Sequence, residues 1–302
     1  MRKRQWWWSY ALVVVVAYAL TVVLSTAPTP LRGELGNFVF DQYQRWLPRP
    51  SDLEQPVRVV NIDDASIQRI GRWPWPRQTM AAIVEALSRA NVAAVGFDVL
   101  FSEKDQPSDD VKACAQRAFR TADQAAHCAE RVDGDVAFAN AIAGRPIVLG
   151  SFFTTVSGGN SEFKPKAGFA FIGDAPNPFL NEFNGGLVPI AVLADPARGL
   201  GFLNWLPDND RVIRRVPLLL DVNGEVQPSL VLEMLRVAQG SSSYVVKSAG
   251  SFGQTSERGS VGVEAIKVGD AVIPSQADGS VRVWFAKLDP RRSIPAWKVL
   301  EP

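Results

Sequence analysis

The sequence predicts an α/β protein in which a mixed sheet follows a single transmembrane helix. Residues 6–24 are almost continuously apolar, and no charged residue occurs between Gln5 and Leu31. Beyond them, short β-branched runs alternate with segments of helical periodicity, which predicts a parallel strand–helix–strand unit. Later apolar runs are separated by turn residues such as Asp278 and Gly279. These runs predict an antiparallel addition to the sheet.

The N-terminal apolar segment has the length and the flanks of a membrane anchor. Its nineteen residues would extend about 28 Å as a helix, close to the hydrocarbon thickness of a bilayer. Arg2, Lys3 and Arg4 precede it, so the positive-inside rule places the N-terminus in the cytoplasm and the following chain outside it. A cleaved signal peptide is the alternative, although its apolar region is usually only ~7–15 residues long. We therefore expect an uncleaved, single-pass anchor in an inner membrane.

This organisation divides the chain into three parts. We expect residues 1–30 to form a cytoplasmic tip and a transmembrane anchor, residues 31–50 a stalk helix, and residues 51–302 an extracytoplasmic domain. Prolines at positions 48, 50 and 56 separate the stalk from that domain. With 302 residues, 47% of them apolar, the chain is long enough for one large core or two moderate ones.

Composition excludes several classes of function. The chain carries 32 basic and 31 acidic residues, and it has no basic stripe interleaved with aromatic residues. Nucleic-acid binding is therefore not expected. No glycine-rich phosphate loop follows a predicted strand, and no nucleophile–base pair is apparent, so we expect neither an enzyme nor a bound cofactor.

Both cysteines lie in one charged, alanine-rich excursion, residues 102–135. In an oxidising compartment Cys114 and Cys128 would form a local disulfide. In the chain-entropy treatment, closing such a loop contributes about 3 kcal/mol. A metal site there is not expected, because His127 is the only histidine and no CxxC spacing occurs.

Individual elements follow from local patterns. Helices are expected at residues 31–46, 65–70, 77–90 and 229–238. Strands are expected at residues 57–62, 92–97, 147–155, 199–205, 212–220, 261–268, 272–273 and 281–285. The first two strands should be buried parallel neighbours, because a helix joins them. Strands 199–205 and 212–220 should pair with each other around a turn at residues 207–210.

Aspartates end the first two predicted strands. Asp63, Asp64 and Asp98 would then meet at the carboxyl edge of the sheet, where they could hold a divalent cation. An anchored periplasmic metal-dependent hydrolase is therefore an alternative function. The adjacent Asp63 and Asp64 cannot both project the same way from an extended strand. Helix and turn capping is accordingly the favoured interpretation of these aspartates.

Two tryptophans, each followed by proline, form a rigid aromatic pair in the loop GRWPWPR. Trp73 and Trp75 could line a ligand pocket or bind a partner protein of the cell envelope, or they could cover the edge of the core. Covering the core is the favoured interpretation. Arg77 directly follows the loop and could form an ion pair with a strand-end aspartate, which would hold the loop in place.

Several segments, in their order, resemble the type 2 CHASE domain: VVNIDDASIQRIGRWPWPR, AAVGFDVLFSEKD, GFLNWLPDNDRVIRRVPLLL and PSLVLEML. The resemblance covers residues 34–300. It implies an extracytoplasmic sensory module of a bacterial receptor, followed by further transmembrane helices and a cytoplasmic cyclase or kinase. Arg211 stands where family members often have glycine. The family usually continues beyond the position of Pro302 into a closing strand, so we expect a domain that is incomplete at its C-terminus.

The leading hypothesis is therefore a membrane-anchored sensor domain that relays a stimulus to an output domain absent from this chain. Its partners would be the membrane, an unidentified small-molecule or envelope ligand, and in a homodimer a second copy of the chain. The stalk is the element expected to move on signalling. The candidate ligand-binding residues are Asp63, Asp64, Trp73, Trp75, Arg77 and Asp98.

Overall fold

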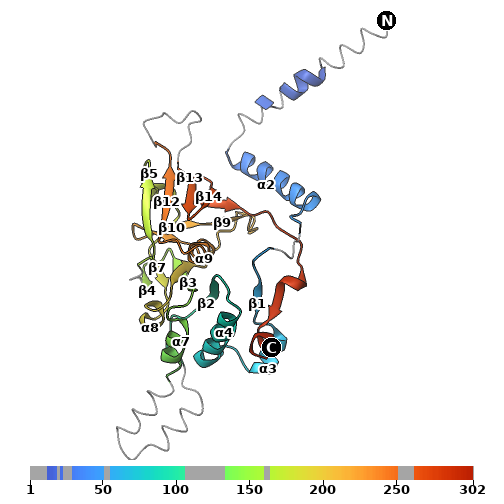
Figure 1. The fold of residues 1–302 in the computed structure, drawn as a ribbon. Coiled ribbons are helices and arrows are strands. Elements are labelled where there is room, and N and C mark those ends of the chain that lie inside the picture. The colour runs from blue at the N-terminus through green and yellow to red at the C-terminus, as the bar shows by residue number, and fades with distance from the viewer. Residues whose placement is uncertain are drawn as a thin grey trace, which may run out of the picture. The chain divides into compact units, whose positions relative to one another are not determined.

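The structure is a computed structural model, and it describes residues 12–18, 21–22, 29–50, 55–105, 133–159, 164–250 and 262–301. The chain forms two compact units (Figure 1). The smaller unit comprises Met1–Pro56 and Trp284–Pro290, and the main unit comprises Val57–Val283 and Arg291–Pro302.

The smaller unit contains the predicted stalk helix, α2 (Thr29–Trp46), which begins two residues earlier than expected. The end of this helix is fixed by a segment from far along the chain. The Trp284 indole N–H donates to the Leu47 carbonyl oxygen at 2.9 Å, and the Phe285 N–H donates to the Gln44 side chain at 3.0 Å. A bridge between Arg49 and Ala286 continues this pairing.

Of the anchor predicted at residues 6–24, residues 12–18 and 21–22 are described and the other ten lie outside the described residues. Within the part of the chain that the structure describes, no helix combines the length and the apolarity needed to cross a membrane.

The central sheet of the main unit is built around β3 (Ile147–Thr154). This strand pairs in parallel with β2 (Val95–Leu100) and with β8 (Gly199–Phe202), and antiparallel with β7 (Gly185–Leu187). The short strand β4 (Gly158–Gly159) extends the sheet beside β7. Helix α7 (Gly134–Ile142) lies between β2 and β3 in the chain. The mixed sheet and its parallel strand–helix–strand unit are thus present, but the unit is β2–α7–β3.

The prediction that the first two strands are parallel neighbours is wrong. The first strand, β1 (Val59–Asn61), pairs instead with β16 (Ser293–Pro295) in a separate two-stranded parallel sheet. It is also not a buried strand, because Val59 is 53% exposed. The partner lies more than 230 residues away, which no local pattern reveals.

Helices cover both faces of the central sheet. Helix α4 (Arg77–Arg89) packs on α7, and both contribute to an apolar core that includes Phe97 of β2. Helix α9 (Leu230–Ala238) contacts β2, β3 and β8. Gly96 and Gly199 permit this approach, because a Cβ at either position would overlap side-chain atoms of Met234 or Glu233 at 2.2 and 2.6 Å. Successive strand residues face opposite sides of a sheet, so Phe97 faces the layer of α4 and α7, and Gly96 faces α9.

The remaining elements surround this sheet. A second sheet has the order β14 (Ala271–Pro274), β13 (Val263–Val268), β12 (Ser243–Ser248) and β5 (Gly168–Ile172), with its first two pairings antiparallel, as predicted. The smaller elements are α3 (Asp64–Ile70), η1 (Asn177–Phe179), β6 (Glu182–Phe183), α8 (Ala191–Ala194), β9 (Arg215–Pro217), β10 (Leu219–Val222), β11 (Glu225–Pro228), β15 (Ser280–Arg282), η3 (Pro290–Arg292) and α10 (Ala296–Leu300).

The predicted pairing of residues 199–205 with residues 212–220 is also wrong. Strand β8 is buried on both faces beside β3, whereas β9 pairs with β15 and β10 pairs with β11 and β6. Gly201 accounts for the burial of β8, because a Cβ there would lie 2.6 Å from the backbone of Leu230. A strand packed this closely from both sides belongs inside a layered sheet and not in an exposed hairpin.

The turn expected at residues 207–210 is present and is held by ion pairs. The Arg214 guanidinium contacts Asp208 at 3.0 Å and Asp210 at 2.7 Å, and Arg215 contacts Asp208 at 2.8 Å. The hydrogen bond from Arg214 lowers the pKa of Asp210 to about 2. Arg211, in this turn, has a positive φ of 65°, a conformation that favours glycine.

A buried ionic cluster joins α9 to the second sheet. Glu233 is fully buried and accepts from the Arg236 guanidinium at 2.6 Å and from the Tyr244 hydroxyl on β12. Arg236 also donates to the carbonyl oxygens of Ser241 and Arg198. Burial, followed by the Glu233 charge, raises the pKa of the Tyr244 phenol, so Tyr244 acts as a hydrogen-bond donor in this cluster.

Replacement of Glu233 tests the structural role of this cluster. Glu233→Ala leaves the buried Arg236 charge and the Tyr244 hydroxyl without their acceptor, so the free energy of unfolding should fall by about 3–5 kcal/mol. Glu225→Ala, at an exposed position of β11, is the control and should change it by less than about 0.5 kcal/mol. Urea denaturation followed by tryptophan fluorescence measures both. Equal losses in the two variants would contradict the assignment.

Candidate functional site

The tryptophan loop joins α3 to α4 and is fixed by its own aromatic side chains. Trp75 is 2% exposed, and its indole N–H donates to the Gly71 carbonyl oxygen at 2.8 Å. Trp73 is partly buried and meets Trp75 edge to face, with ring centroids 5.6 Å apart. Both rings pack on the apolar core, which confirms the prediction that the pair covers the edge of the core. Because it is buried, Trp75 cannot serve as a partner-binding surface.

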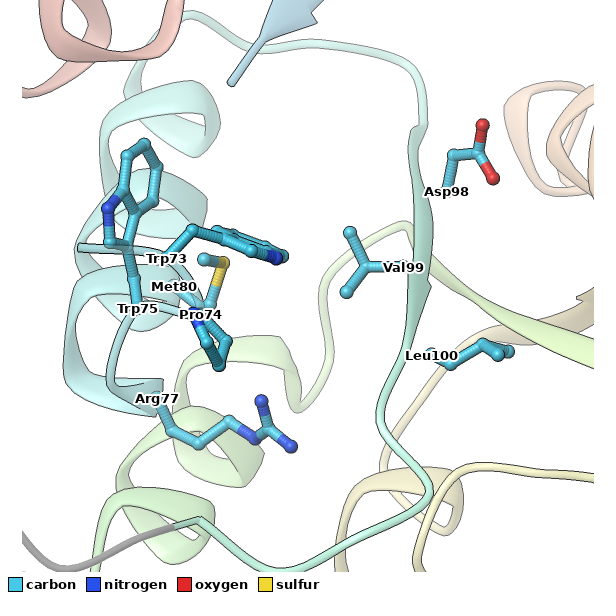
Figure 2. Close-up of a pocket in the computed structure, with 8 residues that line it drawn as sticks. All are labelled: Trp73, Pro74, Trp75, Arg77, Met80, Asp98, Val99 and Leu100. Atoms are coloured by element: carbon cyan, nitrogen blue, oxygen red, sulfur yellow. The ribbon is translucent and has the colours of Figure 1, made fainter. Parts of the chain in front are cut away.

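The same loop also borders a cavity of about 330 Å³. Figure 2 shows Trp73, Pro74 and Met80 on one side of it and Val99 of β2 on the other. The Trp73 ring extends toward Val99, with its indole nitrogen at the end facing the strand. Four of the predicted ligand-binding residues therefore line one cavity: Trp73, Trp75, Arg77 and Asp98.

Asp98 lines this cavity without pointing into it. It lies within β2 and not after it, because the strand continues to Leu100. Strand residues alternate between faces, and in Figure 2 the Asp98 carboxylate points away from the tryptophans while Val99 points toward them. Asp98 is accordingly an exposed rim residue.

Arg77 connects the cavity to the start of the next helix. Its Nε atom lies 3.2 Å from Asp135 Oδ1, and its Nη2 atom donates to the Glu103 carbonyl oxygen at 3.0 Å. Its guanidinium also lies over the Phe101 ring, 4.5 Å from the centroid. The expected ion pair is thus present, but its partner Asp135 stands at the start of α7 and not at the end of a strand.

Two hydrogen bonds from backbone N–H groups to aspartate side chains complete this contact. The Arg77 N–H donates to Asp105 Oδ2 at 3.0 Å, and the Asp105 N–H donates to Asp135 Oδ2 at 2.9 Å. Gly134 allows the close approach, because a Cβ there would lie 2.1 Å from Asp105 Oδ2. Arg77 and the two aspartates therefore hold together the two ends of the segment that separates Asp105 from Asp135. Cys114 and Cys128, with the disulfide predicted between them, lie outside the described residues.

The other two aspartates have a structural role. Asp63 is the N-cap of α3 and accepts from the Ser66 N–H at 2.8 Å, and hydrogen bonds from Ser66 lower its pKa. Asp64 occupies the exposed first turn of the same helix. Among the described residues no group of three acidic, histidine or cysteine side chains is placed to hold a metal ion. The metal site proposed for Asp63, Asp64 and Asp98 is therefore not formed, and the capping interpretation is confirmed for Asp63.

The sequence did not identify Asp105 and Asp135 as part of this site. They lie 28 and 58 residues from Arg77 and are separated from each other by the excursion. The only signal was that acidic residues stand at both ends of the excursion, one of them in the tripeptide Asp133-Gly134-Asp135.

Two matched substitutions distinguish the Asp135 contact from the Asp98 rim position. Asp135→Asn removes the charge that accepts from Arg77 Nε and from the Asp105 N–H, so the free energy of unfolding should fall by about 1.5–3 kcal/mol. Asp98→Asn, on the exposed rim, should change it by less than about 0.5 kcal/mol. Chemical denaturation of both variants measures the difference. A loss at Asp98 as large as that at Asp135 would show that the contacts are wrongly assigned.

Comparison with known proteins identifies the family. Searches of curated proteins and of solved structures gave no significant match. A family profile, that of the CHASE2 domain, matches residues 11–302. This match covers nearly the whole chain and includes both the tryptophan loop and the Arg77 contacts. The chain therefore belongs to the CHASE2 domain family, a family of extracytoplasmic sensory domains.

Proposed function

We propose that this chain is the membrane-anchored sensory part of a bacterial signal-transducing receptor, and that it detects its stimulus at the cavity beside the tryptophan loop. The observation that supports this proposal is that Arg77 lines the cavity and also fixes the start of α7 through Asp135. A molecule bound there touches a group on which two helices and the end of β2 depend. Occupation of the cavity is thereby linked to the arrangement of the domain.

Signalling from such a site requires two conformations that bind the stimulus unequally. The cavity lies between a loop and a strand, so its width changes if the loop moves relative to β2. A ligand that contacts both Trp73 and Val99 favours the conformation in which they are close. Stabilisation of one conformation by its differential affinity is sufficient to shift the population.

The stalk is the proposed route to the membrane. Residues 284–290 follow β15 directly in the chain, and they form the hydrogen bonds that hold the end of α2. A displacement of β15 is therefore transmitted covalently to the partner segment of the stalk. We propose that the output domain is a cytoplasmic cyclase or kinase, as the family resemblance implies.

The proposed topology predicts where a reporter protein will be active. Alkaline phosphatase fused after Pro302 should be active, and a green fluorescent protein at the same position should not fluoresce after Sec-dependent export, because both would lie outside the cytoplasm. Replacing Arg2, Lys3 and Arg4 with glutamate should reduce export, since the positive-inside rule depends on those charges. A cytoplasmic reporter in the unmodified chain would overturn the anchoring proposal.

The proposed site predicts which tryptophan matters for signalling. In a receptor that carries this domain, Trp73→Ala should change the midpoint of the stimulus response about five- to a hundredfold, the usual range of coupling between sites. Trp205→Ala removes a 59% exposed tryptophan away from the cavity and should leave the response unchanged. The cyclase or kinase output in membrane vesicles measures both. Equal responses of the two variants would contradict the site.

A further inference from the structure

The polar side chains that face the cavity supply hydrogen-bond donors only. The Trp73 indole N–H and the Arg77 Nη1 group have no hydrogen-bond partner among the described residues. Figure 2 shows the Trp73 nitrogen directed toward Val99 and the Arg77 guanidinium below Pro74. The Trp75 N–H is already used by Gly71, and the Asp98 carboxylate points away. A molecule in this cavity therefore has to bring its own acceptor atoms.

The charge around the cavity opposes an anionic ligand. The Arg77 charge is matched by Asp135 at 3.2 Å, and the Asp105 carboxylate lies 3.0 Å from the Arg77 backbone nitrogen. The Asp98 carboxylate points away from the cavity and supplies no positive charge either. Because Asp135 already neutralises the guanidinium, the lining offers a carboxylate or phosphate no uncompensated positive charge that would offset its desolvation.

A cationic ligand is opposed by hydrogen bonding. An ammonium group carries donors and no acceptor, so it would face the donors of Trp73 and Arg77 without a partner inside the cavity. A buried donor left without a partner opposes binding, because its lost hydrogen bond to water is not replaced. The chemistry of the lining thus favours an uncharged molecule.

The volume and the lining of the cavity indicate the size and shape of the rest of the ligand. About 330 Å³ is at the lower end of the range for small-molecule sites, so the ligand has one or two rings. The walls are formed by Trp73, Pro74, Met80 and Val99, whose surfaces suit a flat apolar ring, and Trp73 offers an aromatic face or edge.

We infer that the cavity binds a small uncharged ring compound that carries a carbonyl-type oxygen acceptor, such as an amide, ester, lactone or ketone. The ring packs between Trp73 and Val99, and the oxygen accepts from the Trp73 N–H and from Arg77 Nη1. This inference rests on the proposed sensory function and names the ligand class of that same site.

Three probes with the same ring test the inference. Phenylacetamide is uncharged with a carbonyl acceptor, phenylacetate is an anion, and phenethylamine is a cation at neutral pH. Saturation-transfer NMR would be recorded for each with the full 302-residue chain in lipid nanodiscs, with empty nanodiscs subtracted as the blank. The expected order of affinity is phenylacetamide first, with both charged probes at least about threefold weaker, since one hydrogen bond or one unfavourable charge is worth that much.

A pair of tryptophan variants assigns the binding to the cavity. Trp73→Phe keeps an aromatic ring but removes the indole donor, so phenylacetamide should bind roughly three- to tenfold more weakly. Trp205→Phe, the matched change outside the cavity, should leave its affinity unchanged. Thermal unfolding of both variants shows whether each retains its fold.

The outcomes separate this inference from the proposed function. Strongest binding of phenylacetate or of phenethylamine, or equal affinities in the two tryptophan variants, would overturn the ligand class. The absence of binding by all three probes would overturn it as well. If Trp73→Ala nevertheless alters receptor output in that case, the sensory function stands and only the assignment of the ligand is wrong.

Discussion

The arrangement of the main unit depends on the neutralisation of one partly buried positive charge, that of the Arg77 guanidinium. Arg77 stands where the tryptophan loop becomes helix α4, and its guanidinium reaches Asp135 at the start of α7 and the backbone at Glu103. A charge in this position is tolerated only when it is paired and hydrogen-bonded. Through these contacts one side chain sets the position of the loop, the two helices of one layer and the segment that follows β2.

Glycines provide a comparable constraint on the opposite face of the sheet. Gly96, Gly199 and Gly201 let α9 pack closely on the central sheet, against Met234, Glu233 and Leu230 respectively. A larger residue at any of the three would push α9 away from the central sheet, whereas the Glu233–Arg236 pair lies within α9 itself. Helix α9 is therefore held from two directions, by the central sheet at these glycines and by the second sheet through the Tyr244 hydroxyl. The cavity lies on the other face of β2, where the tryptophan loop borders it.

Local elements could be predicted from the sequence, whereas their pairings could not. Helices α4 and α9 and strand β3 appeared near the expected residues, because amphipathic spacing, a preceding proline and the N-cap Ser229 are local signals. The pairing of β1 with β16 depends on residues more than 230 positions apart. The burial of β8 depends on how closely α9 approaches, which is a property of packing.

The same division applies to the candidate site. Trp73, Trp75 and Arg77 were identified because a loop with two prolines and an arginine has few conformations, and these residues do line one cavity. Asp63 caps helix α3, but it was a candidate ligand-binding residue because an aspartate at the end of a strand and an aspartate that caps a helix have the same sequence pattern. Asp135 was missed because it lies 58 residues from Arg77 in the sequence, and no local pattern indicates that the two are in contact.

The pairing of β1 with β16 has a mechanical consequence. These strands are the first and last of the main unit, and they run in the same direction. Tension that enters through residue 57 and leaves through α10 pulls the two strands along their length in opposite directions. The force then acts in shear on all the evenly spaced hydrogen bonds between the two strands at once, so these bonds do not open one after another. The ends of the unit would therefore resist a force applied along the chain, and the displacement would be passed into the rest of the unit.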